Sequence, residues 1–379
     1  MSESEAREQV YQLLGESYQL EDGDPQIALR EEAVRLADLK GDLKLQYFAR
    51  EMFIRACIFG GASEKALVAF AWLLAQFDSN PGMFDQWAIL WKYKWINSVV
   101  CDFPQVPKKR IYEMIDDLEL RAVRAGYGLR ATTNERYLAE KFWDNKEKAI
   151  EYFRRLEALP PDDLSNCPLC ETDARVSFAI YIGDDRRALE IAEPILTGHE
   201  KCGSVPQRTY ASVLLPLIRL GRQEEALRYV VRGYPQIAQN KGFLDRISDH
   251  LICLTLTENF MRAIGLVERH LPWTETTKDA FARFHFFRAA SLLFELLGER
   301  LGDAGVYLEV DTKRPSSFPV PSEIGDYDCA ELTAWFKQKA EAIAVRFDER
   351  NETDFFMRTL AETPSLKTLQ ASFPLLRTD

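Results

Sequence analysis

Three cysteines and one histidine have the types and the spacing that could bind a metal ion. Cys167 and Cys170 form a Cys-x-x-Cys motif, and His199 and Cys202 form a His-x-x-Cys motif further along the chain. Two thiols three positions apart can hold one ion, and four sulfur and imidazole ligands suit tetrahedral zinc. A closed set of four protein ligands leaves no position for water. We therefore expect a zinc ion with a structural role.

The same residues allow two other interpretations. They could be three partly buried free thiols beside a surface histidine, or Cys167 and Cys170 could be a redox pair. The redox interpretation is disfavoured because no strand–helix–strand pattern of the thioredoxin type surrounds the motif. His199 is the least specific of the four ligands, and Asp173 or a water molecule could take its place. A metal- or thiol-dependent enzyme built on this cluster is the competing hypothesis.

Two consecutive helices must position these residues. Cys167 and Cys170 open the first helix, directly after a run of capping residues at 162–166. Thr197 and Gly198 mark the end of the second helix. In an antiparallel pair the start of the first helix lies beside the end of the second, so the two motifs are predicted to meet.

An internal repeat of helix pairs surrounds this site. In each copy a glycine lies five residues before an alanine, as at 61 and 66, 183 and 188, and 221 and 226. The same turn without glycine occurs at Asp144 and Glu258, and Gly23 with Ala28 is a candidate for an earlier copy. Glycine closes the first helix in a left-handed conformation, and a small alanine lets the second helix pack closely. From Ala149 onward the marker alanines are separated by 39, 38 and 37 residues.

This pattern resembles the tetratricopeptide repeat, and in particular divergent bacterial members, because its period exceeds 34 residues and the Trp and final Pro of the family are mostly missing. The resemblance implies an all-α, right-handed superhelix that binds a protein or peptide. It also implies that the first helix of each pair lines the concave face. Polar positions on those helices are the predicted partner-binding residues: Arg55, Asn134, Lys141, Arg208, Arg219 and Asp245.

The repeat also predicts where the helices lie. Helix pairs are expected near 5–40, 42–78, 83–125, 130–158, 167–198, 206–239 and 243–271, with a further helix at 276–299. We expect the solenoid to occupy residues 1–300. The Pro- and Ser-containing segment 301–328 is predicted to be an irregular linker, and residues 303–328 are expected to be mobile because they have little to bury. Residues 329–379 are predicted to form a C-terminal capping helix and a tail.

A stripe of tryptophans has two interpretations. Trp87, Trp91 and Trp95 recur every four residues. On a helix this spacing places them on one face, where they would either pack in the core or receive an apolar partner helix or peptide.

Composition and charge disfavour several classes of function. The net charge is -11 and the isoelectric point is near 5.2, which argues against a nucleic-acid partner. The longest apolar run, at 66–75, is about half as long as a membrane helix, so no membrane association is expected. The polar amino terminus predicts no secretory leader. Seven cysteines, an odd number, suggest reduced thiols in the cytoplasm.

No catalytic motif accompanies the cysteines, so we do not expect an enzyme. The leading hypothesis is a cytoplasmic scaffold or adaptor that binds a protein or peptide and contains a structural zinc site. A peptide-sensing regulator and an immunity or chaperone-like protein are variants of it.

Overall fold

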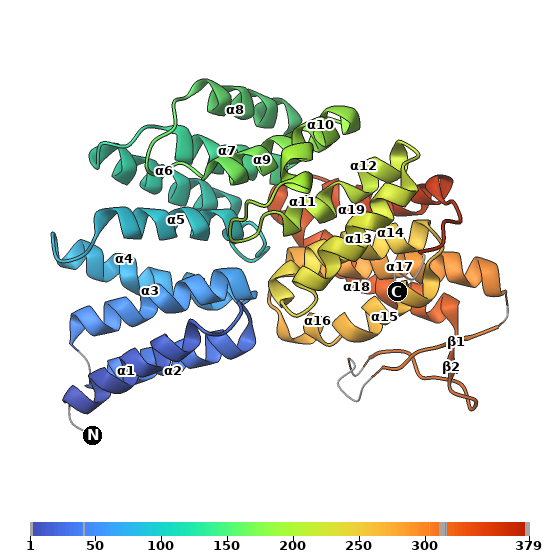
Figure 1. Cartoon of the computed structure of the whole chain (residues 1–379), viewed down its shortest axis with the longest axis horizontal. Helices are drawn as coiled ribbons and strands as arrows, with labels where there is room; N and C mark the ends of the chain where they lie inside the picture. The colour runs from blue at the N-terminus through green and yellow to red at the C-terminus, as the bar shows by residue number, and fades with distance from the viewer. Residues whose placement is uncertain (1–2, 41, 303, 311–314, 316, 376–379) are drawn as a thin grey trace. The chain divides into compact units, whose positions relative to one another are not determined.

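The chain is almost entirely helical. A computed structural model describes residues 3–40, 42–302, 304–310, 315 and 317–375. Within these residues most helices contact the helix that follows them in the sequence, as expected for a helical repeat protein (Figure 1). The predicted all-α class is therefore confirmed. None of the described helices combines the length and the apolar character needed to cross a bilayer.

The chain divides into two compact units, and the first comprises Met1–Asn166 with Asn240–Gly242. Figure 1 shows its helices in colours from blue to green. They are α1 (Glu3–Ser17), α2 (Asp24–Lys40), α3 (Leu43–Gly60), α4 (Ser63–Ser79), α5 (Gln86–Val100), α6 (Lys108–Arg124), α7 (Arg130–Phe142) and α8 (Lys146–Ala158). These bounds agree with the predicted pairs to within a few residues.

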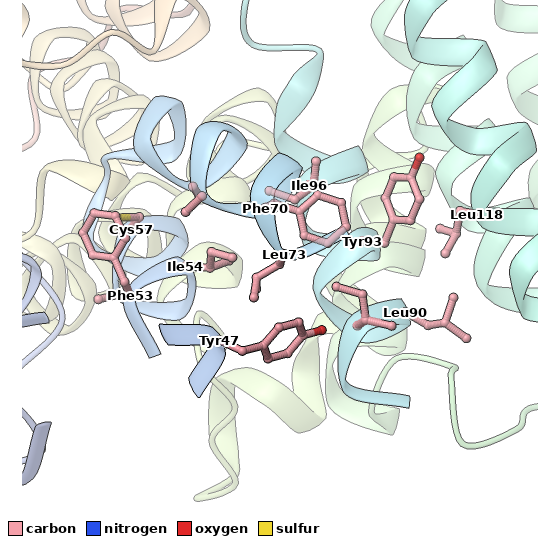
Figure 2. Close-up of a cluster of buried hydrophobic side chains, with 14 of the residues drawn as sticks. Tyr47, Phe53, Ile54, Cys57, Phe70, Leu73, Leu90, Tyr93, Ile96 and Leu118 are labelled. Atoms are coloured by element: carbon pink, nitrogen blue, oxygen red, sulfur yellow. The ribbon is translucent and has the colours of Figure 1, made fainter. Parts of the chain in front are cut away.

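Side chains from α3, α4, α5 and α6 form a core in the first unit (Figure 2). The ring of Phe70 on α4 lies 4.9 Å from the ring of Tyr93 on α5. Ile54 on α3 and Leu73 on α4 are fully buried between these helices, and Leu118 adds α6 to the same cluster. Burial of such side chains removes apolar surface from water, which stabilises the stacked helix pairs.

Three residues from much later in the chain complete the first unit. The Asn240 side chain donates a hydrogen bond to the carbonyl oxygen of Phe59 at 2.8 Å. Lys241 forms an ion pair with Asp24 at 2.5 Å. Gly242 lies against the turn that follows α3. The backbone approach is so close that a Cβ atom at Gly61 would lie 2.5 Å from the Gly242 nitrogen.

The second unit comprises Cys167–Gln239 and Phe243–Asp379. Its α-helices are α9 (Pro168–Tyr181), α10 (Asp185–Thr197), α11 (Gln207–Ser212), α12 (Leu214–Arg219), α13 (Gln223–Ile237), α14 (Leu244–Leu256), α15 (Phe260–His270), α16 (Trp273–Thr276), α17 (Ala280–Leu301), α18 (Cys329–Asn351) and α19 (Phe355–Glu362). Short 3₁₀ turns occur at η1 (Lys241–Phe243), which crosses the boundary between the units, and at η2 (Thr363–Leu369). The helix predicted to begin near 206 is interrupted at Val213. Pro216 has no backbone N–H to bond the carbonyl of Ser212, which accounts for the interruption.

The predicted turns adopt one backbone conformation whether or not they contain glycine. Gly183 and Gly221 have φ of 86° and 73°, and Asp144 and Glu258 have φ of 56° and 58°. The marker alanines that follow these turns are fully buried. Glu258 is held by hydrogen bonds from Arg300 at 2.7 Å and Gln370 at 3.0 Å, which offset its left-handed strain.

The proposed earlier copy of this turn, at Gly23 and Ala28, is wrong. Gly23 does not have a positive φ, and Ala28 is exposed rather than packed. Gly23 precedes α2 directly, so it begins a helix instead of closing one.

The described residues between α17 and α18 include a short strand pair and buried side chains, which the prolines do not predict. Val306–Tyr307 (β1) pairs antiparallel with Asp326–Tyr327 (β2), with Val306 opposite Tyr327. Phe318 is buried, and its ring lies 5.0 Å from the ring of Trp335 on α18. The expectation that 303–328 has little to bury is therefore wrong for its described residues. Residues 303, 311–314 and 316 lie outside them.

Candidate metal centre

Three of the four predicted ligands converge in the second unit. The sulfur of Cys202 lies 3.3 Å from that of Cys167 and 3.5 Å from that of Cys170. All three sulfurs lie within 4.8 Å of one another, and each residue is partly exposed. The cluster could therefore hold one metal ion.

The start of α9 positions two of these sulfurs. Cys167 is the N-cap residue of α9, and its Sγ accepts a hydrogen bond from the backbone N–H of Cys170 at 3.5 Å. Pro168 occupies the first turn, where its fixed φ suits the helix and its missing N–H costs no hydrogen bond. One helical turn separates the two cysteines, so both side chains lie at the same end of the helix.

A short turn after α10 positions the third sulfur. Cys202 and Val205 exchange two backbone hydrogen bonds, from the Cys202 N–H at 2.9 Å and from the Val205 N–H at 3.0 Å. Helices α9 and α10 pack against each other, as predicted for an antiparallel pair. The chain therefore returns to the start of α9 after α10, and the turn fixes Cys202 there.

The three thiols differ in acidity. Burial opposes ionisation of Cys167, but the amide of Cys170 and the neighbouring thiol of Cys202 outweigh it and lower the pKa of Cys167. Burial raises the pKa of Cys170 and of Cys202. Contacts with both other thiols raise the pKa of Cys170 further, and contact with Cys167 raises that of Cys202. A cation that binds here therefore competes with protons, mainly those on Cys170 and Cys202.

The fourth predicted ligand is not brought to the cluster. His199 is exposed and lies outside the group of mutually close ligand atoms formed by the described residues. Asp173, the suggested substitute, is buried and already engaged. It accepts a hydrogen bond from Thr209 at 2.6 Å and forms an ion pair with Arg208 at 3.4 Å. Coordination by His199 stays a prediction.

The predicted partner-binding residues of the first unit already have contacts within it. Arg55 forms an ion pair with Asp22 at 3.1 Å. Asn134 is only 8% exposed and donates a hydrogen bond to Glu135 at 3.2 Å. Lys141 is half-buried near the end of α7.

Those of the second unit are also paired. Arg208 contacts Asp173, and Arg219 forms an ion pair with Asp185 at 3.4 Å. Asp245 forms an ion pair at 3.1 Å with the residue that follows it. A partner that binds these side chains must compete with intramolecular ion pairs, and their role as a binding surface stays a prediction.

The sequence analysis missed a polar network in the second unit. Arg246 contacts Asp245, Asp249 at 3.6 Å and the Ser212 hydroxyl at 3.3 Å. Arg246 and Asp249 are three residues apart on α14, which permits an ion pair on one helix face. This spacing could have predicted the pair from the sequence. The contact with Ser212 on α11 depends on tertiary packing and has no signal in the sequence.

The tryptophan stripe is divided between the core and the surface, because Trp91 packs against the core of the first unit whereas Trp87 is exposed. Trp87 is 43% exposed, stacks on Trp91 with ring centroids 5.1 Å apart, and donates a hydrogen bond to the Asp163 carbonyl at 3.0 Å. Trp95 packs edge-on against Phe59 at 5.3 Å. The core-packing interpretation is therefore wrong for Trp87. The buried residues of α5 lie at other positions and combine apolar with polar side chains: Ile89, Leu90, Tyr93, Ile96 and Val100 with Lys92, Lys94 and Asn97.

Comparison with known proteins leaves the site to be interpreted from its own geometry. The relevant observations are three partly exposed cysteines, which meet at the start of α9, and a chain of helices that pack in sequence order. No protein-family model matches the chain, and no curated protein matches its sequence.

Proposed function

We propose that the chain is a helical-repeat scaffold for a protein or peptide, with a structural zinc ion bound by Cys167, Cys170 and Cys202. The convergence of the three sulfurs is the observation that carries the zinc assignment. With zinc–sulfur bonds of roughly 2.3 Å, neighbouring sulfurs of a tetrahedral site lie about 3.8 Å apart. The separations of 3.3 and 3.5 Å need only a small expansion to reach that geometry.

The fourth ligand in this proposal is His199. It lies three residues before Cys202, on the exposed segment that follows α10. We propose that metal binding repositions this exposed segment so that an imidazole nitrogen of His199 reaches the ion. Zinc accepts mixed cysteine and histidine ligands in its structural sites.

The scaffold part of the proposal is supported by the stacked helix pairs and their repeated turns. Such arrays expose the polar faces of many helices along one extended surface, which suits the recognition of a chain segment. A pull-down from native extract tests it. Replacing Arg208 by Ala should reduce recovery of a specific partner, whereas replacing Arg187, an exposed residue of α10, should not. Equal recovery with both variants would argue against the predicted surface.

Metal analysis tests the zinc site. We expect about one zinc ion per chain in freshly purified protein, and its loss in Cys170→Ser together with a lower melting temperature. Cys329→Ala is the matched control, because Cys329 is a buried cysteine on α18 outside the cluster. His199→Ala should weaken zinc binding less than Cys170→Ser. A chain that contains no metal and does not bind added zinc would contradict the proposal.

A second function is favoured by one observation. Among the described residues only three ligand atoms converge, and catalytic zinc sites commonly have three protein ligands and one open position. If His199→Ala leaves zinc affinity unchanged, the open position belongs to water or substrate, and a zinc-dependent hydrolytic enzyme becomes the better interpretation.

A further inference from the structure

The cysteines of this chain fall into two classes of accessibility. Cys167, Cys170 and Cys202 are partly exposed, whereas Cys57, Cys101, Cys253 and Cys329 are buried. A small oxidant in solution therefore reaches the three sulfurs of the metal cluster in preference to the other four. Exposed thiolates are the ones that oxidise.

Cys202 is the neighbour that both other cysteines share. Its sulfur lies within 3.5 Å of each of them, and closest to Cys167 at 3.3 Å. Cys202 follows exposed residues, His199 and Glu200 among them, so its side chain can move without disturbing the core. A disulfide between Cys167 and Cys202 thus requires little rearrangement.

Cys167 is the position best suited to react first. It caps the amino terminus of α9, where the backbone N–H of Cys170 points at its sulfur. Cys167 is partly exposed and is the cysteine nearest to Cys202, with 3.3 Å between the two sulfurs, so an oxidised Cys167 has its disulfide partner within reach.

We propose that Cys167 and Cys202 are a site of reversible oxidation by a peroxide, and that their disulfide releases the metal ion. This inference rests on the zinc site of the proposed function. It adds that oxidation by a peroxide releases the zinc ion from that site.

The reaction balances with hydrogen peroxide as the oxidant. The Cys167 thiolate attacks one peroxide oxygen, the O–O bond breaks, and one proton is taken up, which gives a sulfenic acid and one water molecule. The Cys202 thiolate then attacks the sulfenic sulfur, takes up a second proton and expels the second water molecule. Two electrons pass from the two thiolates to the peroxide. Cys170 is left as the only cysteine ligand, and one cysteine does not retain zinc.

The oxidised chain keeps a covalent link between the two segments that zinc would otherwise join. The disulfide still links the start of α9 to the turn at Cys202, while Cys170 becomes free. Reduction by a dithiol regenerates the cluster, so zinc binding should recover.

The test uses the full zinc-loaded chain and hydrogen peroxide. We expect release of one zinc ion per chain, measured with a chelating dye, and a Cys167–Cys202 disulfide in the peptide map. Dithiothreitol and added zinc should restore the starting state. Cys329→Ala should behave as the wild type. In metal-free Cys202→Ser, peroxide should give no disulfide to position 202, whereas metal-free wild type should form the Cys167–Cys202 bond.

The outcomes separate this inference from the zinc proposal. Zinc that binds and stays bound under peroxide overturns the oxidation site alone. So does zinc release with a Cys167–Cys170 disulfide, or with sulfinic acids and no disulfide. A chain that never binds zinc overturns both proposals.

Discussion

At the scale of single residues, His250 on α14 has an unusual environment for an ionisable group. It is fully buried, and neither ring nitrogen has a hydrogen-bond partner among the described residues. The ring of Tyr234 lies 6.0 Å from its ring, centroid to centroid. Burial therefore lowers the pKa of His250 from 6.5 to about 3. The ring stays neutral in the folded chain but becomes protonated in the unfolded chain below pH 6.5.

This difference predicts a pH-dependent stability. Because the unfolded state binds the extra proton, the free energy of unfolding falls as the pH drops from about 6.5 towards 3. The contribution of His250 between pH 7 and pH 5 is about 2 kcal/mol. In His250→Gln, the loss of stability over this range should be smaller by that amount, measured by urea denaturation at both pH values. Equal losses in the two proteins would contradict the buried neutral histidine.

The sequence could predict three metal-site residues but not the position of a fourth. Cys167 and Cys170 are placed by helix geometry, and Cys202 is brought to them by the return of an antiparallel pair. His199 lies in the segment between α10 and the Cys202 turn. Its direction depends on the local path of that segment, which has no periodic signal.

At the scale of elements, the turns between paired helices share a left-handed residue but differ in how closely other atoms pack against it. Gly221 has no atom within 4 Å of the place where a Cβ would lie, whereas a Cβ at Gly61 would meet the backbone of Gly242. Both glycines have positive φ. An alanine at Gly221 would therefore add only backbone strain, whereas an alanine at Gly61 would add backbone strain and a steric clash.

Two substitutions test this separation. Gly221→Ala should lower the free energy of unfolding by about 1 kcal/mol, through left-handed strain alone. Gly61→Ala should lower it by about 3 kcal/mol, because the turn must also move away from Gly242. Denaturation followed by circular dichroism measures both. A similar loss in the two variants would show that the contact with Gly242 is not retained in solution.

The segment before α18 gives a second prediction at this scale. Phe318 packs on Trp335 and lies 6.0 Å from the ring of Phe336, so Phe318→Ala should weaken the attachment of the segment by about 3 kcal/mol. Limited proteolysis between 304 and 328 should then become about 100-fold faster. Val320→Ala is the control, because Val320 is 75% exposed. Unchanged cleavage in Phe318→Ala would mean that the ring does not hold this segment.

The same segment shows where composition misleads. Prolines 315, 319 and 321 predicted correctly that no helix continues through it. The prolines do not predict the burial of Phe318, which depends on its tertiary contact with α18. By contrast, the turns at Asp144 and Glu258 were predictable without glycine, because the spacing to the following alanine is local.

At the scale of the whole molecule, the cysteine ligands belong to one compact unit. Cys167, Cys170 and Cys202 lie in the second unit, and the first unit has a core of its own. If the proposed zinc ion is bound, its removal by a chelator should raise amide hydrogen exchange at the start of α9 and around residues 198–206. Exchange in α1–α8 should not change. An equal increase throughout the chain would mean that zinc controls the stability of both units together.

The all-helical architecture was predictable because the repeat is visible in the sequence as a regular spacing. The division into two units was not, since the repeated turns occur on both sides of the boundary at Asn166 and Cys167. The assignment of Asn240–Gly242 to the first unit depends on contacts with Phe59 and Asp24, more than a hundred residues away. Long-range contacts of this kind leave no periodic signal.

This late contribution to the first unit has a consequence for biosynthesis. A ribosome adds about 5–20 residues per second, so roughly 4–15 s separate the emergence of residue 166 from that of residue 242. Helices α9 to α13 are made in that interval. The turn at Gly61 therefore lacks its contact with Gly242 until five helices of the second unit have been synthesised. A nascent chain shorter than 240 residues has the carbonyl of Phe59 and the carboxylate of Asp24 without Asn240 and Lys241, which bind them in the finished protein.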